Sequence, residues 1–174
     1  MSLLVISYPE ITRQDADWIQ AVRQRHTFLR YSILAPHVTL VFPLSSVVED
    51  GLLSHIQLLA TGQPRIRFVL RSSLLVKDDS NNNYYVLLVP DEGFSGVVRL
   101  HDKLYTGILA SKLRLDLPFI PHLTVGFSQN VFGCKSVVDA LNTESFAIYG
   151  EIAYLDVVRE EAETAWTVGR FALG

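Results

Sequence analysis

The chain has 174 residues, of which 49% are hydrophobic and 19% charged, and its formal net charge is −3. This length and composition predict one globular domain with a substantial core, and the negative charge excludes a protein that coats long stretches of nucleic acid. The single cysteine, Cys134, excludes an internal disulfide and a cysteine-based zinc site. The N-terminus lacks a signal-peptide pattern and no apolar run is long enough to cross a membrane, so we expect a cytoplasmic protein with no membrane partner.

The hydrophobic pattern of the first half predicts a strand, a helix, a strand, a helix and a strand, in that order. Apolar residues at helical spacing follow Thr12, whose side chain is suited to cap the first helix. Gly62 marks the end of the second helix, and a polar turn region at 77–83 ends the unit. The predicted strands lie at 3–8, 36–43 and 65–76, and the predicted helices at 12–30 and 48–59.

The second half repeats this order of elements without a linker-like tract before it. We therefore predict a single domain over 1–174, made of two pseudo-symmetric lobes with repeat units at 1–76 and 84–158 and a final strand at 164–173. Within the second unit, strands are expected at 84–89, 121–127 and 146–158, and helices at 95–113 and 135–141.

One heptapeptide occurs once in each half, with proline, histidine, threonine and phenylalanine at the same offsets. A single His-x-Thr carries almost no information, and a lone histidine on a strand is most simply a structural residue. The duplication inverts that judgement and favours a functional pair. The two copies are Pro36-His37-Val38-Thr39-Leu40-Val41-Phe42 and Pro121-His122-Leu123-Thr124-Val125-Gly126-Phe127.

The paired motif is suited to the chemistry of a phosphodiester. Residues two apart on a strand share a face, so His37 lies beside Thr39, and His122 beside Thr124. One neutral imidazole can act as a base while a protonated one acts as an acid, and the hydroxyls can hydrogen-bond the phosphoryl oxygens. Two histidines are too few ligands for a catalytic zinc site, so we expect neither a metal nor a cofactor.

The motifs, their placement in the two halves and the surrounding element order resemble the 2H phosphoesterase superfamily over essentially the whole chain. Within it, the chain looks like the bacterial branch of 2′-5′ RNA ligase-like and RNA 2′,3′-cyclic phosphodiesterase-like proteins. The resemblance implies an α+β fold of two duplicated lobes, with two antiparallel sheets facing a central cleft and helices on the outer faces. It also implies that cyclic phosphates are opened without a cofactor.

The resemblance also implies a role for each motif residue. His37 and His122 match the catalytic histidines, and Thr39 and Thr124 match the phosphate-binding hydroxyls. In relatives that open a 2′,3′-cyclic phosphate to a 2′-phosphate, the second histidine activates water. By that analogy His122 is the base and His37 the acid, although pseudo-symmetry leaves these two roles exchangeable.

The remaining motif positions supply further expectations. On the face of the histidines, Gly126 replaces the Val41 of the first copy, so we expect Gly126 to leave room for a substrate group. In some relatives the aromatic residue that ends the motif stacks near the substrate, which makes Phe42 and Phe127 candidates. On a regular pleat this position faces away from the histidine, which favours core packing unless the strand bends. Phe127 also stands where many ligase-like relatives carry arginine.

Arginines and tyrosines outside the motif are candidates for substrate binding as well. Arg65 and Arg67 share one face of a predicted strand, and Tyr149 in the second half could stack on a base. For all three, a solvated strand face or ordinary packing is the alternative interpretation. Lesser candidates are Arg71, Tyr154, Arg30 and Tyr31, whereas His26, His55 and His101 are expected to be structural.

Three hypotheses on function follow. The first is a phosphodiesterase that hydrolyses a 2′,3′-cyclic phosphate, in a nucleotide or at an RNA end, to a 2′-phosphate. The second is cleavage or ligation of 2′-5′ linkages by the same residues. The third is a non-catalytic module that binds a nucleotide or an RNA end. In each case the partner is a nucleotide or RNA terminus, and we expect a monomer.

Overall fold

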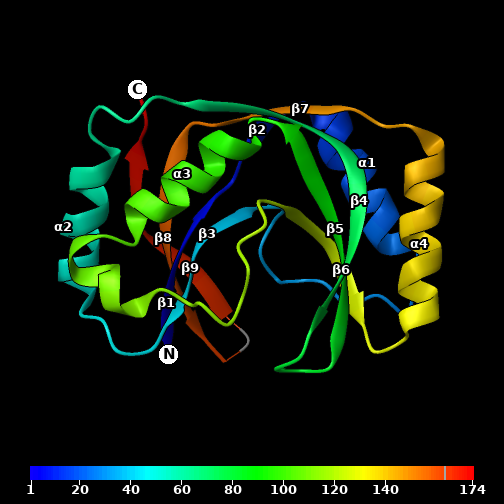
Figure 1. The fold of residues 1–174 in the computed structure, drawn as a ribbon, viewed down its shortest axis with the longest axis horizontal. Coiled ribbons are helices and arrows are strands. Elements are labelled where there is room, and N and C mark those ends of the chain that lie inside the picture. Colours follow the sequence, from blue (N-terminus) through cyan, green and yellow to red (C-terminus); the bar gives the residue numbers. More distant parts are fainter. Residues whose placement is uncertain (163) are drawn as a thin grey trace.

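The computed structural model describes residues 1–162 and 164–174, and it shows two antiparallel sheets (Figure 1). The four-stranded sheet has the order β3 (Val38–Leu44), β1 (Ser2–Ser7), β8 (Tyr154–Glu161) and β9 (Thr164–Ala172). The five-stranded sheet has the order β2 (Glu10–Ile11), β7 (Ile148–Ile152), β4 (Ile66–Asp78), β5 (Asn83–Glu92) and β6 (Leu123–Ser128).

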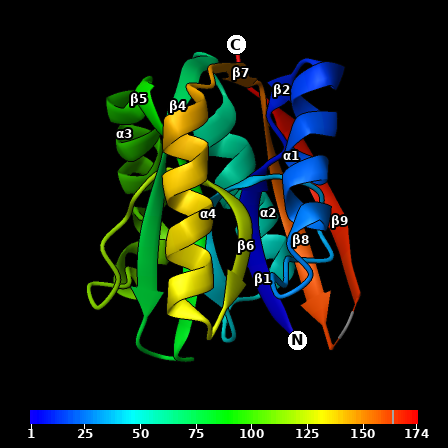
Figure 2. The same ribbon diagram turned by 90° about the vertical axis from the view of Figure 1, so that its right-hand side faces the viewer.

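Helices cover one face of each sheet, which confirms the predicted α+β fold class. α1 (Arg13–Arg25) and α4 (Val131–Glu144) lie side by side on the five-stranded sheet (Figure 2). α2 (Glu49–Ala60), α3 (Phe94–Leu104) and the 3₁₀ helix η1 (Gly107–Lys112) lie on the side of the four-stranded sheet. We call the face of each sheet that is turned away from its helices the inner face. The two inner faces are turned toward each other (Figure 1).

Each sheet combines strands from both ends of the sequence. β1 pairs with β3 on one side and with β8, near the C-terminus, on the other. β4, the third long strand of the first half, instead belongs to the five-stranded sheet, where it pairs with β5 and β7. The helices are exchanged as well, because α1 packs on β6 and α3 packs on β3. Each histidine motif therefore lies on a sheet that is covered by a helix from the other half of the chain.

Several element boundaries differ from those predicted. Thr12 does cap α1, since its hydroxyl accepts a hydrogen bond from the Asp15 amide at 3.1 Å. The helix ends at Arg25, however, because His26 is extended. The helix predicted over 95–113 ends at Leu104, and a separate 3₁₀ helix begins at Gly107, whose φ of +52° is incompatible with a continuing helix.

The predicted strand over 146–158 is in fact two strands. β7 and β8 are separated at Ala153 and belong to different sheets, so this segment is where the chain crosses between them. Ala153 is fully buried, and its carbonyl accepts a hydrogen bond from the Leu173 amide at 2.8 Å. Gly150, a possible break in the predicted strand, lies within β7, and no proline or glycine marks the crossing at Ala153.

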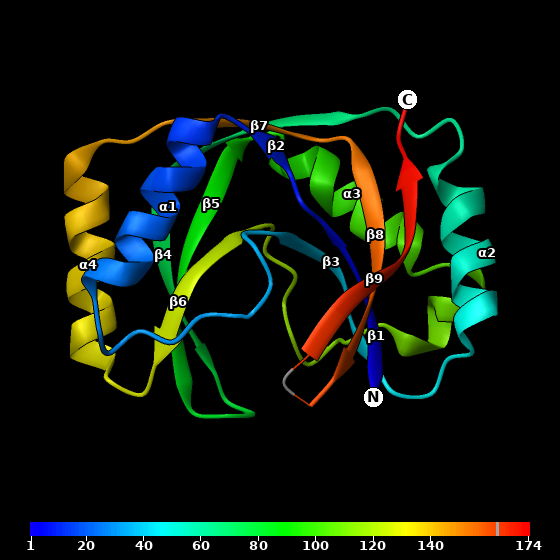
Figure 3. The ribbon, with the colours of Figure 1, turned by 180° about the vertical axis from the view of Figure 1, so that it is seen from behind.

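The core is one continuous cluster of buried residues that includes members of both sheets and all four α-helices. A second, smaller cluster lies on the inner face of the four-stranded sheet, where Leu34 packs over Leu4, Ile6 and Val158. Leu34 belongs to the segment between α1 and β3, which passes from one sheet to the other (Figure 3). Among the described residues, no helix is long and apolar enough to cross a membrane.

Candidate functional site

The two motif histidines immediately precede the equivalent strands β3 and β6, and their imidazoles are held in the same way. The His37 Nδ1 lies 2.8 Å from the Ala35 carbonyl oxygen, and the His122 Nδ1 lies 2.5 Å from the Ile120 carbonyl oxygen. In both copies the partner is the carbonyl two residues earlier, and a carbonyl only accepts. Nδ1 therefore carries the hydrogen, and Nε2 is the nitrogen left for chemistry.

The two histidines are close enough to interact electrostatically. Burial lowers the pKa of His37, the hydrogen bond to the Ala35 carbonyl opposes this effect, and the nearby His122 and Arg23 lower the pKa further. Burial likewise lowers the pKa of His122. Both imidazoles are therefore neutral at neutral pH in the free protein, which is the state that a general base requires.

The threonines lie on the inner faces of the two sheets. Thr39 is opposite Ile6, whose side chain belongs to the inner cluster, and Thr124 is opposite Leu87. Both threonines are half-buried.

Both motif strands carry a β-bulge directly after the threonine. On β3 the pairing passes from Thr39 to Val41, and on β6 it passes from Thr124 to Gly126, so Leu40 and Val125 are the extra residues. Phe127 pairs with Tyr85, two residues from the Leu87 that pairs with Thr124. Cross-strand partners share a face, and the bulge therefore returns Phe127 to the face of Thr124.

The two phenylalanines have different neighbours. The Phe127 ring stacks on Tyr85 with centroids 5.1 Å apart, and the Arg30 guanidinium lies 5.3 Å from its centre. Phe42 instead packs edge-on against Phe119 and His101, at the edge of its sheet. Of the two candidates, Phe127 thus belongs to an aromatic pair on the inner face, whereas Phe42 belongs to a packed aromatic cluster.

The expectation that Gly126 leaves room for a substrate group is wrong. Arg30 forms an isolated bridge with Phe127, donating to its carbonyl at 2.9 Å and accepting from its amide at 2.7 Å. A Cβ at Gly126 would lie 2.9 Å from the Arg30 carbonyl oxygen and 3.1 Å from the Leu29 Cβ. Gly126 therefore permits the chain at 29–30 to approach β6, and that segment occupies the space.

A buried arginine that was not among the predicted site residues contacts the second motif strand. Arg23 on α1 is 3% exposed and donates from Nε to the Val125 carbonyl at 3.2 Å and from Nη2 to the Thr124 carbonyl at 2.7 Å. The Tyr31 ring lies 5.3 Å from its guanidinium carbon. Within the described residues no carboxylate pairs with Arg23. The available signal was its position four residues after Ile19, on the apolar face of the helix.

The bulge on the other sheet is held by a histidine that was expected to be structural. His101 on α3 is 3% exposed, and its Nδ1 lies 2.8 Å from the carbonyl oxygen of Leu40, the extra residue of β3. Its ring stacks on Phe119 with centroids 3.6 Å apart. Each bulge is therefore fixed by a buried side chain from the helix that covers its sheet.

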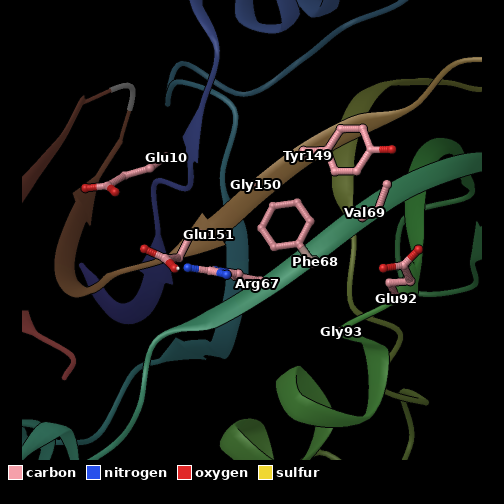
Figure 4. A pocket seen from close by; sticks show the side chains of 9 residues that line it. All are labelled: Glu10, Arg67, Phe68, Val69, Glu92, Gly93, Tyr149, Gly150 and Glu151. Carbon is pink, nitrogen blue, oxygen red and sulfur yellow. Dashed lines mark hydrogen bonds and ion pairs between the residues drawn. The ribbon is translucent and has the colours of Figure 1, made fainter.

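Arg65, Arg67 and Tyr149 lie together, but not with the histidines. They are at the end of the five-stranded sheet, where Arg67 and Tyr149 line a cavity of about 500 Å³ with Glu151 (Figure 4). Both arginines pair with Glu151, at 3.2 and 3.3 Å.

This cavity is remote from Thr124. Thr124 pairs with Leu87 on β5, and Leu87 pairs with Leu74 on β4. From Leu74 back to Arg67, β4 spans about 23 Å at 3.3 Å per residue. Arg67 is therefore too distant to share one phosphate with Thr124. Within the described residues, no group of three or more histidine, cysteine or acidic side chains is arranged to hold a metal ion.

Comparisons with known proteins agree with this architecture. Two similar solved structures are TT0787 of Thermus thermophilus (TM-score 0.69, 17% identity, covering 99% of this chain and 98% of that one) and E. coli LigT in apo form (0.63, 18%, 99% and 96%). Usb1 of Kluyveromyces marxianus is also similar (0.53, 12%, 96% and 97%). At these identities the likeness shows a shared fold.

Sequence comparison supplies the family. No curated protein matches the chain. A family model described as the 2′-5′ RNA ligase superfamily matches residues 11–164, which include both histidine motifs and most of the elements around them. Since this match covers most of the sequence and the fold agrees over the whole chain, the protein belongs to the 2′-5′ RNA ligase superfamily of 2H phosphoesterases.

Proposed function

We propose that the protein is a metal-independent phosphodiesterase that hydrolyses a 2′,3′-cyclic phosphate, in a nucleotide or at an RNA end, to a 2′-phosphate. The observation that carries this proposal is the matched pair of histidines. Burial lowers the pKa of both, and each is tethered through Nδ1 to the carbonyl two residues earlier, which leaves each Nε2 available. A half-buried threonine hydroxyl accompanies each histidine on an inner face.

In the proposed reaction, His122 Nε2 accepts a proton from a water molecule as the water oxygen forms a bond to phosphorus. The bond between phosphorus and the 3′-oxygen breaks, and His37, protonated at Nε2, gives its proton to that oxygen. Binding of the anionic phosphate raises the pKa of His37 and supplies the protonated acid. The Thr39 and Thr124 hydroxyls donate to the non-bridging oxygens, where charge accumulates in the transition state.

The superfamily and its neighbours support a nucleotide or RNA ligand. Solved structures of E. coli LigT are described as complexes with NADP+, 3′-AMP, ATP and phosphate. The stacked pair of Phe127 and Tyr85, on the face of Thr124, offers an aromatic surface for a base. The buried Arg23 adds a positive charge beside His37, which favours an anionic substrate.

Turnover of adenosine 2′,3′-cyclic phosphate tests the proposal. We expect conversion to the 2′-phosphate, a bell-shaped pH dependence and insensitivity to chelators, with loss of activity in His37→Ala and in His122→Ala. His26→Ala is the matched control, because this histidine follows α1 and lies outside the motif. Full activity in either motif variant would exclude paired-histidine catalysis. Binding of the cyclic nucleotide without turnover would instead indicate a binding module.

The superfamily description favours one further candidate function, the cleavage or ligation of 2′-5′ linkages by the same four side chains. Incubation with matched 2′-5′ and 3′-5′ oligonucleotides distinguishes it from the first. Selective cleavage or joining of the 2′-5′ linkage, without hydrolysis of the cyclic nucleotide, would favour this second function.

A further inference from the structure

A row of inner-face residues crosses the four-stranded sheet from the first motif to β9. Thr39 is opposite Ile6, Ile6 is opposite Asp156, and Asp156 is opposite Arg170. Cross-strand partners share a face, so all four side chains project from the inner face. Two residues after Ile6, just beyond β1, the Tyr8 ring lies edge-on to the His37 ring, with centroids 6.3 Å apart. Arg170 thus lies on the same inner face as the first motif.

The Arg170 side chain is held in a defined position. Its guanidinium carbon lies 4.5 Å from the centre of the Tyr154 ring, and its Nε lies 3.5 Å from Oδ1 of Asp156. The guanidinium thus leans over β8, which is two strand spacings, or about 10 Å, from β3. The side chain is 52% exposed, and within the described residues it pairs with no second acid. Its terminal nitrogens are therefore available to a ligand.

The buried carboxylate of Asp156 destabilises the fold, because it is removed from water and only partly paired. It is 1% exposed, and its Oδ2 has no hydrogen-bond partner within the described residues. Burial raises its pKa, and Arg170 acts in the opposite direction. On the other sheet, the row that starts at Thr124 continues through two leucines, Leu87 and Leu74. A leucine at 156 would avoid the desolvation of a carboxylate, so packing alone does not account for the acid.

We propose that Arg170, oriented by Asp156 and Tyr154, binds a second phosphoryl group of the substrate, on the 5′ side of the nucleotide that reacts at the histidines. The inference rests on the proposed function, in which a cyclic phosphate lies beside His37. A distance of about two strand spacings along the sheet is of the order of one nucleotide. A guanidinium fixed along one edge by a carboxylate can offer its other edge to phosphoryl oxygens.

This 5′ phosphoryl group has two sources, which present the same anionic oxygens. It is either a free 5′-phosphate or the diester that joins the reacting nucleotide to the preceding one in RNA. In both cases, the protein distinguishes a nucleotide with a 5′ phosphoryl group from a bare cyclic nucleoside phosphate. The apolar row on the other sheet carries no charge that would do so.

Three substrates test this inference: adenosine 2′,3′-cyclic phosphate, the same compound with a 5′-phosphate, and a dinucleotide that ends in a cyclic phosphate. We expect higher kcat/KM for the second and third than for the first. In Arg170→Ala this preference should fall about tenfold or more, as expected for the loss of charge-assisted hydrogen bonds. Arg170→Lys keeps the charge and should retain part of it. A preference for the dinucleotide over the 5′-phosphate indicates an RNA end.

Arg13→Ala is the matched control, because it changes the net charge equally at a side chain that is 95% exposed on α1. It should retain the wild-type preference. The inference is overturned if the wild type shows no preference, or if Arg170→Ala keeps it. Calorimetric affinities for adenosine 3′,5′-bisphosphate and adenosine 3′-phosphate make the same comparison without turnover. Absence of turnover with all three substrates would therefore refute the proposed function, while the affinity ratio would still decide this inference.

Discussion

Replacement of Arg23 tests how the five-stranded sheet presents its motif. In Arg23→Met the side chain keeps most of its apolar length, but the Thr124 and Val125 carbonyls lose their donors. An orphaned buried acceptor costs about 1–3 kcal/mol, and removal of a buried, unpaired charge returns part of that cost. We expect a net loss of about 2 kcal/mol in the free energy of unfolding. Arg23→Lys retains the charge and one donor, and should lose about half as much.

The charge of Arg23 has a separate effect on His37. Because that charge contributes to lowering the His37 pKa, we expect the pKa to rise in Arg23→Met and to stay low in Arg23→Lys. Inhibition by inorganic phosphate should weaken in Arg23→Met for the same electrostatic reason. Urea denaturation measures the stabilities, and an NMR titration of the imidazole signals measures the pKa.

Arg13→Met, which removes an exposed arginine from the same helix, is the control. It should leave the unfolding free energy, the His37 pKa and the inhibition by phosphate unchanged. The reasoning would be refuted by a folded Arg23→Met variant whose His37 titrates as in the wild type and whose phosphate inhibition is unchanged. Arg23 would then be a purely structural residue that holds the bulge.

Three further predictions concern the frame of the site. Gly126→Ala should cost about 1–3 kcal/mol in unfolding free energy, because its Cβ meets the Arg30 carbonyl, whereas Gly51→Ala, open on α2, should be neutral or stabilising by denaturant titration. Burial lowers the pKa of His101, so its contribution to stability is complete above the unfolded pKa of about 6.5 and is lost as the pH falls. In thermal melts, His101→Gln should therefore lose less stability at acidic pH than the wild type does. An unchanged dependence of the melting temperature on pH would contradict this. Asn142→Leu should cost about 1–3 kcal/mol by chemical denaturation, since it orphans the buried amide and carbonyl of Ser73, and an unchanged midpoint would refute this.

The sequence was sufficient for the fold class. A period of two on a short apolar strand predicts, with no tertiary information, that His37 lies beside Thr39. The bulge one residue later leaves no local signal, because Leu40 and Val41 are apolar in either register. The return of Phe127 to the face of Thr124, and the loss of space at Gly126, both depend on that bulge or on the approach of residues 29–30.

Contacts between distant parts of the chain account for the other differences. Arg23 meets its two carbonyl acceptors across 102 and 101 residues of sequence, and no local pattern specifies such a pairing. The crossing at Ala153 is not indicated by the local sequence, because no proline or glycine stands at this point. Parity alone placed Arg65 and Arg67 on one face, but it says nothing about which end of a sheet they occupy.

The exchange of strands between the sheets has a consequence for synthesis of the chain. β1 is among the first segments to be synthesised, yet β8, which pairs with it, is among the last. Ser2 is paired with Glu160, 158 residues later in the sequence. The four-stranded sheet, which carries Thr39 and Arg170, therefore cannot form completely until almost the entire polypeptide has left the ribosome. The five-stranded sheet is more local, since β4, β5 and β6 follow one another. Contacts of high sequence separation form slowly, so the half-site of His122 is expected to be organised before that of His37. A chain cut short near its C-terminus would then present one ordered motif and one without its sheet.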